Sequence, residues 1–123
     1  MRVGIIRCLS HAKNCPGTGC FRAINENEGE FNKYDNIELV GFTTCGGCPV
    51  DNTKENLNEI ELLLNHGAEV IHISTCATIL CPFINKISEA IKEAHPNMKL
   101  FNGTHSGKLS WGKIKDQYPR VIE

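Results

Sequence analysis

Residues 52–76 read NTKENLNEIELLLNHGAEVIHISTC, a stretch that predicts a helix followed directly by a strand. Asn52 is placed to cap the helix, and Glu55, three residues later, is its capping-box partner. The buried face of this helix is a stripe of apolar residues at helical spacing: Leu57, Ile60, Leu63 and Leu64. Gly67 lies where glycine commonly ends a helix, and the segment 69–74, with the sequence EVIHIS, has the length of a buried strand. The stretch is therefore one helix–strand unit of an α/β fold.

The same alternation extends along the chain. Residues 3–6, 37–42 and 98–101 predict further strands, and the continuous apolar character of 3–6 suits a strand that is covered on both faces. A weak helix over residues 20–27 separates the first two strands, and a helix that begins at Pro82 separates the last two. The expected order is therefore β-α-β-α-β-α-β.

This alternation predicts parallel strands joined by right-handed crossover helices, which cover both faces of the sheet. We predict one α/β domain over residues 1–123, with a three-layer, flavodoxin-like or Rossmann-like parallel sheet of about four strands in the order 2-1-3-4. Ligands of such a sheet bind outside the carboxyl ends of its strands. Loops are expected from His11 to Gly19 and over 29–36, and one helical turn near Trp111 to Lys115.

The charge pattern argues against nucleic-acid and membrane partners. The chain has 13 basic and 14 acidic side chains, and a net charge of −1 creates no strong field. Aromatic residues, at 7%, are too few for a base-stacking platform. Apolar stretches stay well short of the roughly 20 residues that span a bilayer, and the start MRVGIIRC lacks a secretory apolar region. We expect a cytoplasmic protein, and the sequence does not reveal whether it has a protein partner.

Seven cysteines in a chain that can form its own hydrophobic core are more typical of metal binding or catalysis than of disulfide cross-linking. The count is odd, which disfavours a disulfide framework. Six of the thiols lie after the predicted strands: Cys8 after the first, Cys15 in the adjoining loop, Cys45 and Cys48 after the second, and Cys76 and Cys81 after the third. Because the carboxyl ends of parallel strands share one edge of a sheet, these thiols are expected to meet there.

The most specific motif is Cys-Gly-Gly-Cys at residues 45–48. Two intervening residues let both sulfurs reach one metal ion, or each other in a disulfide. Three cysteines directly precede a proline: Cys15, Cys48 and Cys81. Proline pushes the residue before it toward extended geometry, so each of these thiols is expected outside a helix.

The five histidines differ in their candidacy as ligands. His105 follows the fourth predicted strand, at the same edge as the thiols, and is the strongest candidate. His72 lies inside a strand and is expected to be a hydrogen-bonded core residue. His66 and His95 end helices, where a cation is favourable. His11 ranks behind His105, together with Cys20.

The order of these motifs resembles the CGGC-domain family of small prokaryotic proteins. The resemblance covers most of the chain and rests on the segments 4–8 (Gly-Ile-Ile-Arg-Cys), 15–18 (Cys-Pro-Gly-Thr), 40–42 (Val-Gly-Phe), 45–49 (Cys-Gly-Gly-Cys-Pro), 74–76 (Ser-Thr-Cys), 81–82 (Cys-Pro) and 103–105 (Gly-Thr-His). It implies a metal-binding domain, with zinc suggested by the cysteines and histidines of the family. It brings no established reaction.

A metal-binding protein is the first functional hypothesis. Its candidate ligands are Cys8, Cys15, Cys45, Cys48, Cys76, Cys81 and His105. Four thiolates, or three with an imidazole, suit tetrahedral zinc, and the same soft sulfur ligands suit an iron–sulfur cluster. A zinc ion that only holds the structure together is not needed, because an α/β core of this size folds without one.

Two other hypotheses use the same residues. In a thiol–disulfide oxidoreductase, Cys45 would attack a disulfide and Cys48 would resolve the mixed disulfide, although two glycines replace the usual residues between such thiols. Alternatively, the cysteines are buried and inert, because cysteine is among the most frequently buried residue types. That hypothesis predicts cysteines inside strands and on helix faces, whereas the sequence places them in loops beside glycine and proline.

Overall fold

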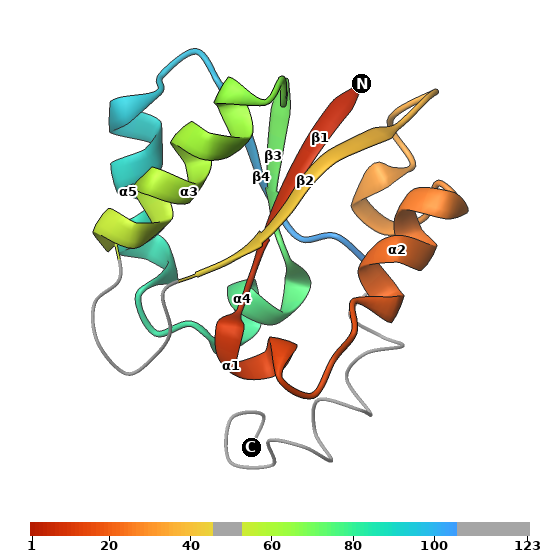
Figure 1. Ribbon diagram of the computed structural model, residues 1–123, viewed down its shortest axis with the longest axis horizontal. Coiled ribbons are helices and arrows are strands. Elements are labelled where there is room, and N and C mark those ends of the chain that lie inside the picture. Colours follow the sequence, from red (N-terminus) through yellow and green to blue (C-terminus); the bar gives the residue numbers. More distant parts are fainter. Residues whose placement is uncertain (46–52, 106–123) are drawn as a thin grey trace.

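The computed structural model describes residues 1–45 and 53–105. Its centre is a sheet whose strands all pair in parallel (Figure 1). The strands are β1 (Arg2–Arg7), β2 (Glu38–Thr44), β3 (Val70–Ile73) and β4 (Lys99–Asn102). They are arranged in the order β2-β1-β3-β4, which confirms the predicted order 2-1-3-4.

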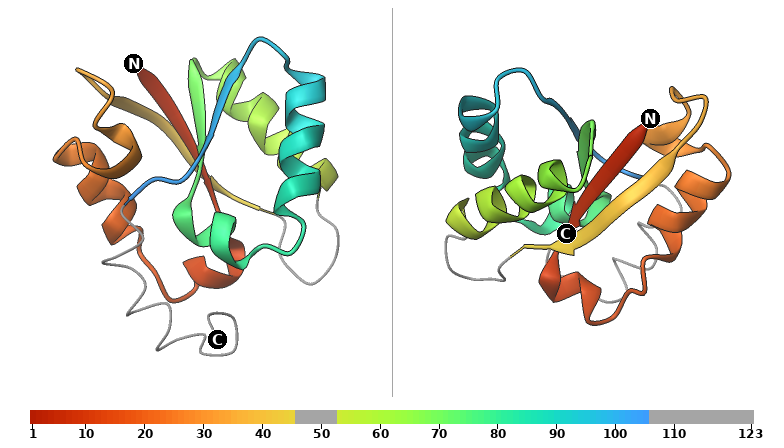
Figure 2. Two further views of the ribbon diagram at one scale, coloured as in Figure 1. Left: turned by 180° about the vertical axis from the view of Figure 1, so that it is seen from behind. Right: turned by 45° about the horizontal axis from the view of Figure 1, so that its top comes forward.

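Helices cover both faces of this sheet, so the predicted three layers are confirmed. The described helices are α1 (Leu9–Ala12), α2 (Thr18–Asn25), α3 (Thr53–Asn65), α4 (Thr75–Leu80) and α5 (Ile84–Ala94), with a 3-10 turn, η1 (Gly29–Phe31). Helices α3 and α5 lie on one face, and α2 lies on the other (Figure 2). The short helices α1 and α4 lie together at the end where β1 and β3 finish (Figure 1).

The predicted apolar stripe of α3 forms the core on its face of the sheet. Ile60 and Leu63 are buried, and they pack in one cluster with Ile6 of β1, Ile71 of β3 and Ile91 of α5. Helix α3 therefore presents its apolar positions to both the sheet and its neighbouring helix.

The predicted end of α3 is also confirmed. Gly67 has a φ of +100°, a left-handed conformation that favours glycine. The N–H of Ala68 then donates to the carbonyl oxygen of Leu63 at 3.1 Å, which satisfies one of the last helical carbonyls. The capping position predicted for Asn52, and the helical turn predicted near Trp111, lie outside the described residues.

Four local expectations need correction. Leu9–Ala12 and Thr75–Leu80 are short helices. Part of the first segment was expected to be a loop, and no helix was expected in the second. Helix α5 begins at Ile84, two residues after the predicted start at Pro82. Helix α2 covers Thr18–Asn25 instead of 20–27. Helices of four to six residues are too short to show an apolar period, so their sequences carry little signal.

His72 is a satisfied core residue on the other face, as predicted. Its imidazole is fully buried. A carbonyl can only accept, so Nδ1–H donates to the Gly103 carbonyl oxygen at 2.8 Å. Nε2 then accepts from the hydroxyl of Tyr34, also at 2.8 Å. The rings of Phe31 and Phe101 pack on the imidazole at centroid distances of 4.6 and 5.4 Å. His72 is therefore held as one neutral tautomer.

This arrangement predicts that the protein loses stability as the pH falls. Burial lowers the pKa of His72 below its usual value of 6.5, and nearby Lys33 acts in the same direction, while the bond to Gly103 and the charge of Glu30 oppose the shift. Below 6.5 the unfolded chain therefore binds more protons than the folded chain. The contribution of His72 to the free energy of unfolding is therefore complete above pH 6.5. It decreases by at most about 1.4 kcal/mol per pH unit as the pH falls toward the folded-state pKa.

Urea titrations between about pH 7.5 and pH 5 measure this effect. In a His72→Phe variant the absolute stability is expected to be lower at neutral pH, because the Tyr34 hydroxyl loses its acceptor. Its dependence on pH is nevertheless expected to be shallower. Equal pH slopes in the two proteins would show that His72 does not carry the effect.

Within the described part of the chain, no helix has both the length and the apolar character needed to cross a membrane.

Candidate functional site

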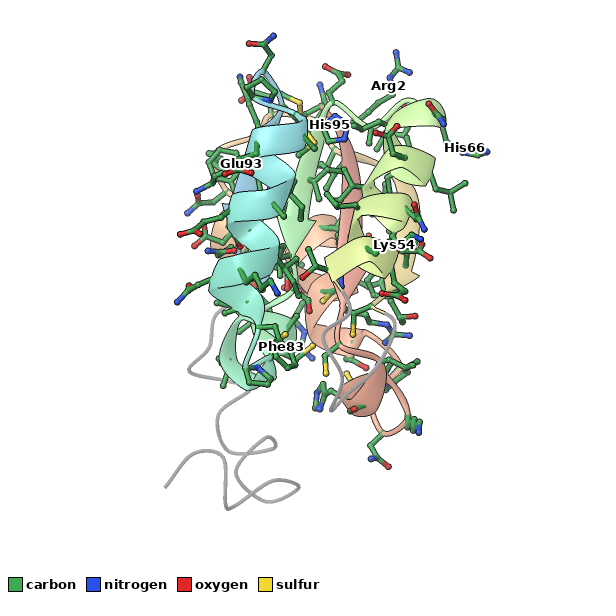
Figure 3. The ribbon with its side chains drawn as sticks, turned by 90° about the vertical axis from the view of Figure 1, so that its left-hand side faces the viewer. Arg2, Lys54, His66, Phe83, Glu93 and His95 are labelled. Carbon is green, nitrogen blue, oxygen red and sulfur yellow. The ribbon has the colours of Figure 1, made fainter. Side chains whose placement is uncertain are left out.

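Three thiols gather where the three neighbouring strands β2, β1 and β3 end. Cys8 follows β1 and is the N-cap residue of α1. Cys45 follows β2 directly, and Cys76 lies in the first turn of α4, just after β3. All three are buried. Figure 3 shows sulfur atoms, in yellow, at this end of the molecule near the labelled Phe83. Cys8, Cys45 and Cys76 thus follow strands that end at the carboxyl edge of the sheet, and all three are buried there instead of lying open at a pocket rim.

Cys8 and Cys45 are the closest partners within this group. The last residues paired between β1 and β2 are Arg7 and Thr44, so the two cysteines occupy the next position on each strand. The N–H of Cys45 donates to the Arg7 carbonyl oxygen at 2.9 Å, which extends the ladder by one step. A side-chain hydrogen bond joins the Cys8 and Cys45 thiols directly.

Backbone groups also contact these sulfur atoms. The N–H of Leu9 donates to Sγ of Cys45 at 3.3 Å, and the N–H of His11 donates to Sγ of Cys8. The pKa of the Cys8 thiol is nevertheless well above its usual range, because the hydrogen bond with Cys45 and burial both favour the protonated form. Cys8 is therefore held in its protonated form beside Cys45.

Cys76 has a polar partner of its own. Its Sγ lies 3.0 Å from the hydroxyl oxygen of Ser74. The same hydroxyl accepts a hydrogen bond from the N–H of Ala77 at 3.2 Å, so it is the side-chain cap of α4. Capping thus fixes the position of Ser74, and Ser74 in turn fixes the Cys76 thiol beside the Cys8 and Cys45 pair.

A pocket lies behind these thiols, between the sheet edge and α5. Three cysteines line it: Cys8, Cys45 and Cys81. Its remaining walls are apolar apart from Asn56, and they consist of Ile6, Ile73, Ala77, Ile84, Ile87 and Ile91. Cys81 has a ψ of 117° at the end of α4, which is the extended geometry predicted for a residue before proline. The structure thus brings Cys81 to the same pocket as Cys8 and Cys45.

Cys15 and Cys20 make their contacts elsewhere, around α2. Sγ of Cys20 lies 3.2 Å from the hydroxyl of Thr104, and burial raises the pKa of this thiol to about 11. Sγ of Cys15 accepts a hydrogen bond from the N–H of Gly17 at 3.4 Å. Neither thiol lines the pocket that Cys8, Cys45 and Cys81 share.

The two histidines that were considered as ligands lie in different elements: His105 follows β4 and packs near α2, whereas His11 lies in α1. The ring of His105 packs on Gly19, where a Cβ atom would come within 2.7 Å of it. His11 is buried in α1, and burial, together with the nearby charges of His105 and Arg7, lowers its pKa. A neutral imidazole is the form that binds a metal ion. His11, which ranked behind His105 among the candidate ligands, is therefore favoured in that neutral form.

The described residues satisfy part of what a metal site requires. Among residues 1–45 and 53–105, no group of three or more Cys, His, Asp or Glu side chains is arranged to hold a metal ion. Two thiols, Cys8 and Cys45, are already in contact, and sulfur donors match the chemistry of zinc and of iron–sulfur clusters. Cys48, the second cysteine of the Cys-Gly-Gly-Cys motif, lies outside the described residues. The full ligand set stays a prediction.

Sequence reasoning missed the polar residues that support these thiols. Ser74, Thr75 and Thr104 are buried, and the hydroxyl of Thr104 accepts from the N–H of Thr75 at 3.3 Å. Thr75 in turn donates from its hydroxyl to the carbonyl oxygen of His105 at 3.0 Å. The available signal was a pair of polar segments, Ser-Thr-Cys and Gly-Thr-His, directly after two buried strands.

Comparison with known proteins gives consistent results. A sequence model described as the CGGC domain matches residues 2–105. An uncharacterized protein of Methanocaldococcus jannaschii, MJ0582, is 38% identical over 115 residues, which cover 86% of this chain and 88% of that protein. A second uncharacterized protein of the same organism, MJ0766, is 41% identical over 58 residues, or 44% of this chain and 83% of that protein. No solved structure matches the chain.

Proposed function

This chain belongs to the CGGC-domain family, and from that premise we propose that it binds a transition-metal ion through cysteine thiolates at the carboxyl edge of its sheet. The observation that carries the proposal is the direct contact between the thiols of Cys8 and Cys45, which come from neighbouring strands. Cys76 is buried at the end of the next strand, at the same edge. Zinc is the proposed metal, and an iron–sulfur cluster is the alternative.

Cys8 and Cys45 are the first two proposed ligands. Cys48 is the third, because two residues between cysteines suit chelation of one ion. Cys76 or Cys81 would supply the fourth sulfur, since Cys76 lies at the adjacent strand end and Cys81 lines the same pocket. Cys15 and His105 stay candidates for a larger cluster. A bound zinc ion would act as a Lewis acid or hold the thiolates together, and thiols release their protons when they bind it.

Metal content after anaerobic purification tests this proposal. We expect about one metal equivalent per folded chain by elemental analysis, as four sulfur ligands suit one zinc ion. An absorption spectrum of the same sample separates the two metals, because zinc is colourless and an iron–sulfur cluster absorbs visible light. A folded, metal-free chain whose thiols are all reduced, and which takes up neither zinc nor iron and sulfide on reconstitution, would rule the proposal out.

A thiol–disulfide oxidoreductase is the second candidate. The observation that favours it is the hydrogen bond from the N–H of Leu9 to Sγ of Cys45, because such a donor stabilises a thiolate. Cys45 would attack a substrate disulfide and Cys48 would resolve the product. Turnover in a disulfide-reduction assay that is lost in Cys45→Ser, by a chain that binds no metal, would favour this candidate over the first.

A further inference from the structure

The partner of Cys45 across the sheet is Cys8, which no motif in the sequence links to it. We propose that Cys8 and Cys45 are a redox-active pair that forms a reversible disulfide between the carboxyl ends of β1 and β2. This proposal goes beyond metal binding, because the disulfide needs no metal. It also differs from the Cys45–Cys48 pair that the spacing of the motif indicates.

The sheet sets the separation that such a bond needs. Neighbouring strands lie about 4.8 Å apart, and disulfides join Cα atoms that are roughly 4.4–6.8 Å apart. Arg7 and Thr44 are paired between β1 and β2, and the 2.9 Å bond from the N–H of Cys45 to the Arg7 carbonyl oxygen extends this pairing to the cysteines. The backbone therefore has little distance to move when the bond forms.

The two side chains also lie on the same side of the sheet. Cys8 and Cys45 both line the pocket beside α5, and their thiols are joined by a hydrogen bond. Two other buried thiols contact hydroxyl groups instead, Cys20 at Thr104 and Cys76 at Ser74. Among these buried thiols, Cys8 and Cys45 are thus the pair whose sulfur atoms are hydrogen-bonded to each other.

A low-molecular-weight disulfide is the oxidant that converts the two thiols into the Cys8–Cys45 disulfide. The Cys45 sulfur attacks one sulfur of that disulfide, a mixed disulfide forms, and one small thiolate leaves. The Cys8 sulfur then attacks Sγ of Cys45, the Cys8–Cys45 bond forms, and the second small thiolate leaves. The protons of the two cysteines pass to the two released thiolates. The chain loses two electrons, and the small disulfide gains them.

Cys45 is the better placed of the two to react first. Both sulfur atoms receive a backbone hydrogen bond, from the N–H of Leu9 at Cys45 and from the N–H of His11 at Cys8, but Cys45 is 8% exposed whereas Cys8 is 3% exposed. The pocket beside it has mostly apolar walls, which suit a small uncharged oxidant better than a charged one. If the proposed metal site also exists, oxidation would remove two of its ligands, so the disulfide and the bound metal would exclude each other.

A cysteine map of metal-free protein tests the pair. The full chain with Cys48→Ser is reduced, treated with a chelator, exposed to 2-hydroxyethyl disulfide, alkylated and digested with trypsin. In this variant, residues 8–13 contain Cys8 alone and residues 34–54 contain Cys45 alone. We expect these two peptides to be linked as the main product, with a loss of two alkylatable thiols. Cys15 with Cys20, and Cys76 with Cys81, fall in separate peptides at 14–22 and 55–86.

A second variant reports the order of the steps. With Cys8→Ser added, Cys45 has lost its resolving partner, so a mercaptoethanol adduct should accumulate on the 34–54 peptide. The proposal is overturned if Cys8 stays fully alkylatable while other thiols oxidise, or if its peptide is linked mainly to 14–22 or 55–86. Because a chelator is present throughout, neither result depends on whether the chain binds metal. Circular dichroism before oxidation verifies that both variants are folded.

Discussion

Replacing Ile60 by alanine is expected to lower the free energy of unfolding by about 2–5 kcal/mol. Ile60 is fully buried in the centre of α3 and packs in the cluster formed by α3, α5 and the sheet. Truncation removes apolar area and leaves a cavity that the surrounding side chains only partly fill. The effect is measured as a lower urea midpoint with an unchanged dependence of the unfolding free energy on urea.

Leu62→Ala in the same helix is the matched control. Leu62 is 48% exposed and lies two residues from Ile60, so its truncation should change stability by less than about 0.5 kcal/mol. Both variants place alanine in the interior of α3, so a difference in helix propensity cannot explain the contrast. Comparable losses in the two variants would mean that α3 packs through a different face from the one described.

The architecture of this chain was predictable because local signals agree with the long-range arrangement. The apolar stripe of α3, the glycine at 67 and the segment 69–74 specify a helix, its end and a strand before any tertiary contact is considered. Strand order then followed from right-handed crossovers. The short helix α4 was missed because its six residues, Thr-Cys-Ala-Thr-Ile-Leu, include two β-branched threonines and are too few to show a period.

The candidate site was only partly predictable. The position of each thiol relative to the end of a strand could be counted in the sequence, and so the meeting of Cys8, Cys45 and Cys76 was expected. Which two of them touch depends on the register between β1 and β2, and that register is set by packing over the whole sheet. The register shift between Val3 and Gly4 is what places Cys8 opposite Cys45.

This register also limits what the Cys-Gly-Gly-Cys motif means. From the sequence, Cys45 and Cys48 are the natural pair because two residues separate them. In the fold, Cys45 already has a sulfur neighbour from another strand, and Cys76 is fixed nearby by Ser74. A site assembled from three strand ends can hold a metal ion more rigidly than one built from a single short motif, because the sheet fixes the backbone of each ligand.

Zinc affinity is expected to fall roughly a hundredfold in a Cys45→Ser variant. A four-ligand zinc site contributes about 10–16 kcal/mol, so one thiolate accounts for roughly 3 kcal/mol, which corresponds to about two powers of ten in the dissociation constant. Cys45 is the proposed ligand whose loss should matter most, since it contacts Cys8 and begins the Cys-Gly-Gly-Cys motif. Competition with a chromophoric chelator at fixed pH measures the change.

Cys20→Ser is the control that separates coordination from general damage. Cys20 is also buried, but it is on α2 and its Sγ contacts Thr104. A serine hydroxyl can keep that contact, so zinc affinity should stay within about threefold of the wild-type value, a difference below 1 kcal/mol. If both variants lost affinity equally, the metal would not be bound where Cys8 and Cys45 meet. If neither did, Cys45 would not be a ligand, and its contact with Cys8 would serve only the disulfide chemistry.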